Sequence, residues 1–476
     1  MRRCIIFFGV MAAITLYSKR YEAAPGGSIS ETIKKCYEFG KAGDTVFIKP
    51  GRYTEKILAL DSIYIVGSGP ESTIIEYGEG DAPTLTVTKK ITTWIANLKL
   101  VYNGTGKPVI FTDSANFFGC SNCVIEGDYI GIVFHNSKDE LDNVKIISKA
   151  TAVLLEGGEL KISQGEILDG ATGIDVKGGT IDLSDITIKL AKQTGLWLHD
   201  GSKGKIENCY ITNCGAYGVL VETRSDLTIL NSKIEKSNNT GIYIKEGSKV
   251  IIKSSQILNS VKYGIMVKGG VVHVDSCVVE GNKYGVGFLG VSESSLKHSQ
   301  ILHNKKDGVY LKKAKNVKIE SNVIKHNSNG IDGKTASAEC INNLIARNEY
   351  YGVKIDGEGT FLLKNNTIAK NNFAGVSIID NAVCNLVNNI IAFNKEWGII
   401  AEAEGKLPGK PTLEYNCVYG NGSGEQYNYT SGVAHPKDIN IDPKFIDPTK
   451  ENFKLGSGSP CLNKGKGGEH IGAVIE

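Results

Sequence analysis

A short phrase of residues repeats along most of this chain, at steps of about 21–23 residues. Each copy holds two short runs of alternating apolar and polar residues, and a glycine opens the second run. In four successive copies this glycine is Gly218, Gly241, Gly264 and Gly285. Alternation with a period of two indicates half-buried strands. Because a unit of this size cannot bury its apolar face alone, the copies must stack on one another.

The glycine position recurs from Gly131 to Gly398, with Ala152 in its place once. A polar residue recurs at the same step, and we expect it to point into the coil and to bond its counterparts in the next coils. This row contains Asn97, Asn122, Asn143, Gln164, Asp185, Asn208, Asn231, Ser254, Ser276, His298, Ser321, Asn342, Asn365 and Asn388. A second row is also interpreted as structural, and it contains Asn282, Asn304, Asn327, Asn348, Asn371, Asn394 and Asn421.

Val and Ile dominate the runs and no helical period appears, which favours a parallel β-helix over a leucine-rich repeat. The pattern resembles the right-handed parallel β-helix repeat of the pectin-lyase-like superfamily, in its secreted or periplasmic bacterial form, over roughly residues 30–421. The resemblance implies an all-β solenoid of about 15 coils, with an N-terminal capping helix and a C-terminal closing segment. It implies no single activity, because this fold carries lyases, hydrolases, epimerases, adhesins and inert stalks.

The order of segments predicts four parts. Residues 1–24 form a signal peptide or an uncleaved anchor, since Arg2 and Arg3 precede an apolar run. Residues 25–44 form the N-terminal cap, with a helix that begins after Ser28, which has capping-box spacing to Glu31. Residues 45–421 form the parallel β-helix, and residues 422–476 form a loop and capping tail. We therefore expect a secreted, periplasmic or cell-surface protein, with no membrane contact beyond the possible anchor.

Charge and cysteine usage argue against several classes of partner. The formal net charge of +3 comes from 54 basic and 51 acidic residues, so no overall field favours nucleic acid. The pair Cys120 and Cys123 has no second matched pair, which argues against a zinc site. No carboxylate cluster suited to a divalent cation stands out in the repeat. We therefore predict no metal and no cofactor.

Aromatic residues gather at two positions of the repeat, beside and just before the glycine. Flat aromatic surface can stack on the apolar faces of sugar rings, so we interpret this row as a binding surface for polysaccharide or cell-surface glycan. The alternative is that a loop or the C-terminal tail packs over it, because monomers rarely leave such patches bare. The candidate substrate-binding residues are Trp197, Tyr217, Tyr243, Tyr263, Tyr284, Tyr310, Tyr351 and Trp397.

The catalytic motifs of the superfamily are mostly missing: there is no Asp-Asp and no Gly-His-Gly. A neighbourhood of charged residues, with Asp332 breaking the apolar run at 331–333, offers the catalytic candidates Asp332, Arg347, Lys354 and His326. A histidine or lysine there could remove a proton from a uronate carbon. The alternative is an ordinary solvated surface.

These patterns favour an extracytoplasmic polysaccharide-binding β-helix protein without a demonstrable catalytic centre. One alternative is a polysaccharide lyase, hydrolase or epimerase that acts on an acidic glycan. The coils have nearly constant length and offer few insertions to wall a groove, which argues against an enzyme. The other alternative is a structural surface protein or adhesin whose coils serve as a stalk.

Overall fold

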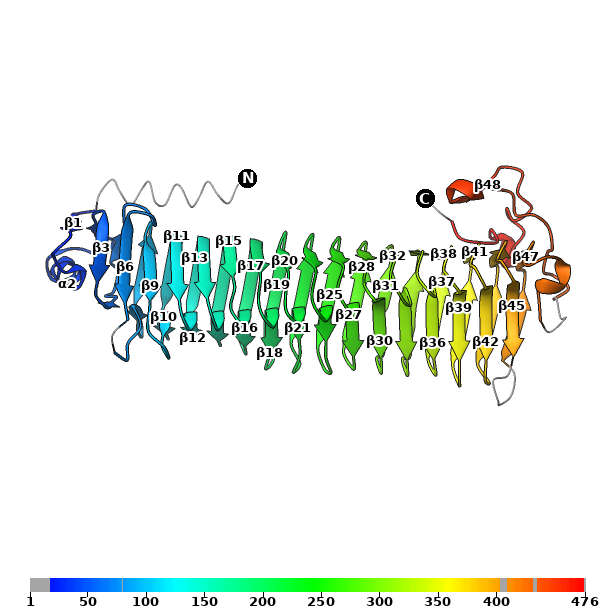
Figure 1. The fold of residues 1–476 in the computed structure, drawn as a ribbon, viewed down its shortest axis with the longest axis horizontal. Coiled ribbons are helices and arrows are strands. Elements are labelled where there is room, and N and C mark those ends of the chain that lie inside the picture. Colours follow the sequence, from blue (N-terminus) through cyan, green and yellow to red (C-terminus); the bar gives the residue numbers. More distant parts are fainter. Residues whose placement is uncertain (1–17, 79, 403–408, 431–434, 475–476) are drawn as a thin grey trace. The chain divides into compact units, whose positions relative to one another are not determined.

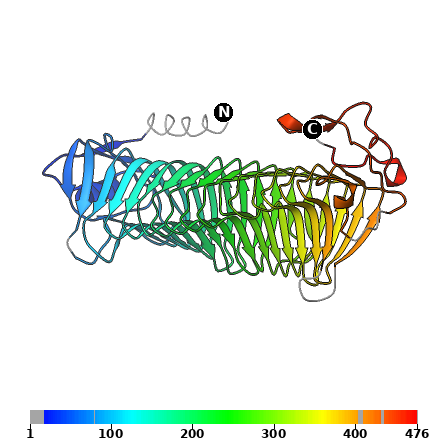
Figure 2. The same ribbon diagram turned by 45° about the vertical axis from the view of Figure 1, so that its right-hand side comes forward.

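The computed structural model describes residues 18–78, 80–402, 409–430 and 435–474, and it confirms the predicted parallel β-helix (Figure 1). Strands of equivalent position in successive coils pair in parallel, as in β27 (Tyr263–Lys268), β30 (Tyr284–Leu289) and β33 (Val309–Lys312). The strands at the repeat glycine, together with three earlier strands at the equivalent position, form one sheet of sixteen described strands, against about fifteen expected coils. Figure 2 shows the same coils turned toward the C-terminal part of the chain.

The chain divides into two compact units, Met1–Leu220 with Arg224–Asp226, and Val221–Thr223 with Leu227–Glu476. In the first unit the strands of the glycine series are β4 (Ile57–Leu58), β7 (Leu85–Val87), β10 (Pro108–Asp113), β12 (Ile130–His135), β14 (Thr151–Glu156), β16 (Thr172–Lys177), β18 (Thr194–His199) and β21 (Tyr217–Val221), whose last residue belongs to the second unit. In the second unit they are β24 (Thr240–Ile244), β27, β30, β33, β36 (Ile331–Lys334), β39 (Tyr351–Asp356), β42 (Ala374–Ile379) and β45 (Trp397–Glu402).

A helix at the start of the first unit confirms the predicted one. It is α2 (Ile29–Phe39), and the Ser28 hydroxyl at its N-cap accepts a hydrogen bond from the Glu31 backbone N–H at 3.1 Å. The Glu55 carboxylate accepts a second bond from the Ile29 N–H at 2.7 Å, so another orphan donor of the first turn is satisfied. The buried face of α2 carries Ile33 and Cys36. This helix stands beside β1 (Arg20–Ala23) and β2 (Thr45–Ile48), which pair in parallel.

Buried asparagines connect successive coils, but most of the first predicted row is on the outside. Asn122, for example, is exposed and has a φ of 50°. A residue in this left-handed conformation turns the chain, and the next residue points inward. The inward ladder therefore lies one residue later, where the Nδ2 of Asn322 donates to the Oδ1 of Asn343 at 2.9 Å. The expected inward direction of the first row was wrong by one position, whereas the second row, which was interpreted as structural, is buried.

The C-terminal tail packs on the outside of a different set of strands. These strands are β38 (Leu344–Ala346), β41 (Thr367–Ala369), β44 (Ile390–Ala392) and β47 (Cys417–Tyr419). Phe445, Phe453 and Ile471 of the tail form one buried apolar cluster with Leu344 and Ala369. The tail also holds a short antiparallel pair, β48 (Phe445–Asp447), which is labelled in Figure 1, and β49 (Asn452–Leu455).

The predicted signal or anchor falls largely on residues 1–17, which lie outside the described residues. Within the residues that are described, no helix has the length and apolar character needed to cross a bilayer.

Candidate functional site

One row of outward side chains runs across the glycine-series strands of the second unit. The strand pairing aligns Tyr310 of β33 with Asp332 of β36, and Asp332 with Lys354 of β39. The inward neighbours Ile331 and Val353 are fully buried in the coil, so alternation places Asp332 and Lys354 on the outside. The whole row reads Tyr243, Met266, Gly287, Tyr310, Asp332, Lys354, Ser377 and Ile400.

Three tyrosines of neighbouring coils form a continuous aromatic surface, and all three are half-buried. The rings of Tyr263 and Tyr284 stack at 4.8 Å between centroids, and the rings of Tyr284 and Tyr310 lie 6.0 Å apart. Gly287 makes room for this stack, because a Cβ there would lie 2.7 Å from the Tyr263 ring. We call the outward surface of β27, β30, β33, β36 and β39 the tyrosine face.

The other predicted aromatic residues have different surroundings. Tyr351 of β39 meets Phe373 edge to face at 5.1 Å, and the Nζ of Lys354 lies 5.6 Å from the Tyr351 ring. Tyr243 has the Nζ of Lys245 at 5.5 Å from its ring centroid.

Trp397 of β45 aligns with Ala374 of β42 and lies outside the tyrosine stack. In the first unit, the ring of Trp197 lies 4.5 Å from that of His199. Tyr217, also in the first unit, begins strand β21 (Tyr217–Val221). Of the eight predicted residues, the structure therefore joins Tyr263, Tyr284 and Tyr310 in one stack.

Two buried carboxyl groups belong to this region, Asp332 on β36 and Asp307 two residues before β33. Asp307 and Asp332 are only 6% and 7% exposed. The pKa of Asp332 is raised to about 6, chiefly by burial and also by the nearby charge of Asp307, while Lys334 and Lys354 oppose both effects. Burial likewise raises the pKa of Asp307, against a hydrogen bond from Asn329 that lowers it. Groups that titrate away from their ordinary range are frequent at functional sites.

The two carboxyls differ in their partners. The Nδ2 of Asn329 donates to Asp307 Oδ1 at 2.8 Å, and Asn329 in turn accepts from the Tyr351 N–H at 3.3 Å. The Oδ1 of Asp332 is buried and has no hydrogen-bond partner in the described structure. Sequence reasoning missed Asp307 because its place in the repeat, just before the glycine, holds tyrosine in the two preceding coils.

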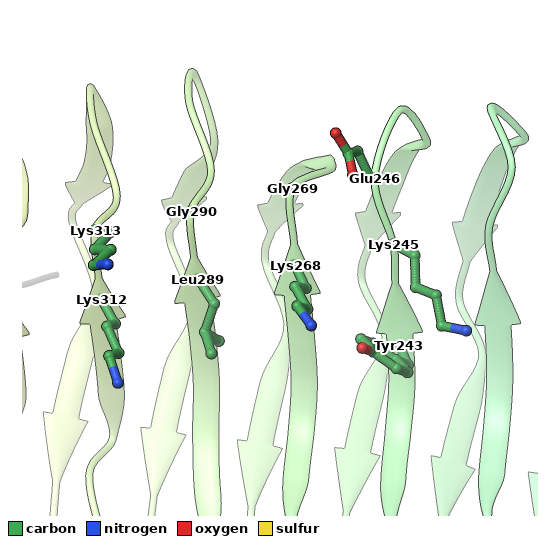
Figure 3. Close-up of a pocket in the computed structure, with 9 residues that line it drawn as sticks. All are labelled: Tyr243, Lys245, Glu246, Lys268, Gly269, Leu289, Gly290, Lys312 and Lys313. Atoms are coloured by element: carbon green, nitrogen blue, oxygen red, sulfur yellow. The ribbon is translucent and has the colours of Figure 1, made fainter.

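A basic groove lies along the same strands, at the end where they leave the sheet (Figure 3). Its volume is about 750 Å³, and Lys268, Leu289 and Lys312 line it from consecutive strands. Lys245 is paired with Glu222. Within the described part of the chain, no ion pair involves Lys268, Lys312 or Lys313, and their positive charge is available to an anionic group.

Two catalytic candidates lie away from the tyrosine face. Glu451 of the tail accepts hydrogen bonds from His326 Nε2 at 2.9 Å and from Lys325 Nζ at 2.7 Å, and it forms an ion pair with Arg347, whose Nε lies 3.0 Å away. The structure therefore does not bring the four catalytic candidates together. Asp332 and Lys354 are adjacent on the tyrosine face, whereas His326 and Arg347 hold the tail.

These ion pairs balance burial. Burial alone would raise the pKa of Glu451, but Lys325, His326 and Arg347 lower it below its usual value. Burial lowers the pKa of His326, against the raising effect of Glu451. The stacked rings of His303 and His326, 4.7 Å apart, continue this row on the neighbouring coil. We attribute the role of His326 and Arg347 to docking of the tail.

Residues that could hold a metal do not gather: the described residues contain no group of three or more His, Cys, Asp or Glu side chains with suitable geometry. The cysteines from Cys36 to Cys461 are buried free thiols, and burial raises the pKa of Cys209 to about 11. They behave as small apolar residues.

Comparison with known proteins identifies the repeat. The sequence profile described as "Right handed beta helix region" matches residues 108–279, 217–359 and 284–438. A search of curated proteins finds no match.

Solved structures give weak similarities. One is the A-module of the Azotobacter vinelandii mannuronan C-5 epimerase AlgE6, with 15% identity, coverage of 83% of this chain and 94% of that chain, and a TM-score of 0.36. Another is pectin methylesterase from carrot, with 12% identity, coverage of 55% and 83%, and a TM-score of 0.34. At these scores neither similarity indicates an activity of this chain.

Proposed function

Because the chain belongs to the right-handed β-helix family, whose stacked coils place equivalent side chains in rows, we propose that its tyrosine face binds a polysaccharide. The observation that carries this proposal is the stack of Tyr263, Tyr284 and Tyr310. These rings come from successive coils, and their centroids lie 4.8 Å apart for Tyr263 and Tyr284 and 6.0 Å apart for the tilted pair of Tyr284 and Tyr310, close to the ~5 Å spacing of the strands. An extended sugar chain could therefore lie along them, with its apolar ring faces against the aromatic rings.

The position of the tail supports this proposal. The apolar residues of the tail are buried on β38, β41, β44 and β47, which belong to another sheet than the tyrosine face. Packing under this part of the tail therefore does not account for the three tyrosines, which stay half-exposed.

The basic groove favours an anionic polymer. Lys268 and Lys312 lie in the row next to that of Met266 and Tyr310, two residues further along each strand. Carboxylate or sulfate groups on the sugars could pair with these ammonium groups while the rings stack on the tyrosines. We further propose that the protein acts outside the cytoplasm, because Arg2, Arg3 and the apolar run after them have the composition of a secretion signal.

Affinity electrophoresis of the full chain tests the proposal, with gels that contain polygalacturonate, alginate, hyaluronan or a neutral β-glucan. We expect at least one anionic polymer to retard the protein. Tyr284→Ala should weaken this retardation by about tenfold or more, since loss of one stacked ring costs roughly 1–3 kcal/mol in comparable stacking sites. Tyr37→Ala is the matched control, because Tyr37 lies on α2 and is 57% exposed.

The lysines supply a second arm of the same experiment. Changing Lys268 and Lys312 together to Gln should weaken retardation by the anionic polymer and reduce its dependence on salt. Retardation by none of the polymers, or equal retardation of wild type and Tyr284→Ala, would contradict the proposal and favour a structural surface protein.

A further inference from the structure

The cations of the basic groove are unevenly spaced along the coil axis. The strand pairing aligns Lys268 of β27 with Leu289 of β30, and Leu289 with Lys312 of β33. Figure 3 shows these three side chains on consecutive strands, with the leucine between the two lysines. Because neighbouring strands lie ~4.8 Å apart, Lys268 and Lys312 are separated by two coils, or roughly 10 Å along the axis. The coil between them holds an uncharged residue in this row.

The same row carries further lysines, but acidic residues accompany them. Lys245, one residue beyond the aligned pair of Ile244 and Val267, forms an ion pair with Glu222. Lys334 of β36 has Asp356 of β39 as its register partner. The two lysines that flank the leucine are exposed, and in the described ranges of the chain neither takes part in an ion pair. An anionic ligand would therefore find its cations in this row two coils apart.

The middle coil presents an apolar surface at this place. Leu289 is half-buried, and its Cδ1 lies 3.3 Å from the position that a Cβ at Gly287 would occupy. Tyr284 of the same strand is the middle ring of the tyrosine stack. A carboxylate or sulfate above Leu289 would lose water without gaining a cationic partner, which costs free energy. An uncharged sugar avoids this cost, and its apolar parts can pack against the leucine.

Building on the proposed polysaccharide site, we propose that the polymer carries an anionic group on every second sugar, with an uncharged sugar between. An extended sugar chain advances by about one strand spacing per sugar, so a disaccharide repeat spans the two coils that separate Lys268 from Lys312. The anionic groups of successive repeats pair with these two ammonium groups, and the uncharged sugar lies over Leu289. Hyaluronan has a repeat of this kind, whereas polygalacturonate and alginate carry a carboxylate on every sugar.

The test compares these polymers in the affinity gels, at equal mass concentration and equal ionic strength. We expect wild type to bind hyaluronan at least about tenfold more tightly than polygalacturonate or alginate, because a carboxylate held over Leu289 has no partner. Attraction by charge alone predicts the opposite order, since polygalacturonate and alginate have the higher charge density. The neutral β-glucan should bind more weakly than hyaluronan, because it leaves both lysines unpaired.

Leu289→Lys supplies the cation that the middle coil lacks. This variant should bind polygalacturonate about tenfold more tightly than wild type does, and its preference for hyaluronan should disappear. Leu58→Lys is the matched control. Leu58 lies on β4, a strand of the same series in the first unit, and it is 55% exposed, so the substitution adds the same charge outside the groove. This control should keep the wild-type preference.

Equal or tighter binding of polygalacturonate or alginate by wild type would overturn the alternating polymer while the binding proposal stands. The same change of preference in Leu289→Lys and Leu58→Lys, or no change in either, would also overturn it. Failure of every polymer to retard the chain would contradict both proposals. If Leu289→Lys did not fold, the comparison of polymers on wild type would still decide, because it needs no variant.

Discussion

The protonation of Asp332 should make the free energy of unfolding depend on pH. Its pKa rises from 3.8 to about 6 on folding, so the folded chain holds the proton more tightly than the unfolded chain. The resulting stabilisation is fully present below about pH 4 and is lost as the pH rises through about 6. An asparagine at this position cannot ionise and avoids that loss.

We therefore compare the free energy of unfolding of Asp332→Asn with that of wild type at two pH values. This difference should favour the variant by roughly 2–3 kcal/mol more at about pH 8 than at about pH 4. Urea denaturation at both pH values measures this difference. Because any effect of the amide on packing is common to both conditions, it cancels. An equal effect of the substitution at the two pH values would show that Asp332 titrates normally.

The inward asparagine ladder gives a second prediction at this scale. Asn322 accepts from the Ser299 N–H at 2.9 Å and donates to the Leu296 carbonyl at 2.8 Å. Asn322→Leu would leave these buried groups unpaired, so we expect a loss of about 1–3 kcal/mol in the free energy of unfolding. Ser321→Asn is the control, because Ser321 lies in the outward left-handed position, which asparagine tolerates. Equal losses for both would contradict the assigned register.

The repeat made the fold predictable, but not the direction of every residue. Spacing in the sequence shows that polar residues recur at the repeat positions of Asn365 and Asn366. Only the backbone shows that Asn365 has a φ of 55° and that Asn366 is fully buried. Asp332 could be predicted because it interrupts an apolar run. Asp307 could not, because one aspartate in a column of varied residues, with tyrosine in the two preceding coils, has no distinctive spacing.

At the scale of elements, the tail is held by charge as well as by its apolar cluster. Glu451 lies just before β49 and forms ion pairs with three cations of the coils. Lys325 and His326 are adjacent in one coil, and Arg347 lies in the next. The period of the repeat could not predict this contact, since the tail lies outside the periodic part of the chain. Because the contact with the tail could not be predicted, the sequence offered His326 and Arg347 as catalytic candidates.

We expect Glu451→Gln to lower the free energy of unfolding by about 1–2 kcal/mol at neutral pH, because three partly buried cations lose their shared partner. The lowered pKa of Glu451 means that this stabilisation is present above about pH 4.5 and is lost as the pH falls below it. Thermal unfolding and limited proteolysis of the tail measure the effect. Glu358→Gln, at an exposed turn, should change neither thermal unfolding nor proteolysis of the tail. An equal effect of both variants would contradict the role of Glu451 in holding the tail.

At the scale of the molecule, the solenoid separates stability from function. Inward Val, Ile and Asn residues repeat almost without change and hold the coils together, whereas the outward positions differ from coil to coil. On β33, β36 and β39 the outward row changes from tyrosine to aspartate to lysine while the inward residues stay apolar or small. Family membership follows from the inward pattern, and the proposed function depends on the outward one.

Oxidative footprinting of the full chain, with and without the polymer that retards it, tests the proposed location of binding most directly. Hydroxyl radicals modify accessible aromatic rings, and a bound sugar shields the rings beneath it. The account predicts that the polymer protects Tyr263, Tyr284 and Tyr310 and leaves Tyr37 and Tyr350 as reactive as before. Protection of Tyr350 or Tyr37 without protection of the three stacked tyrosines would contradict it.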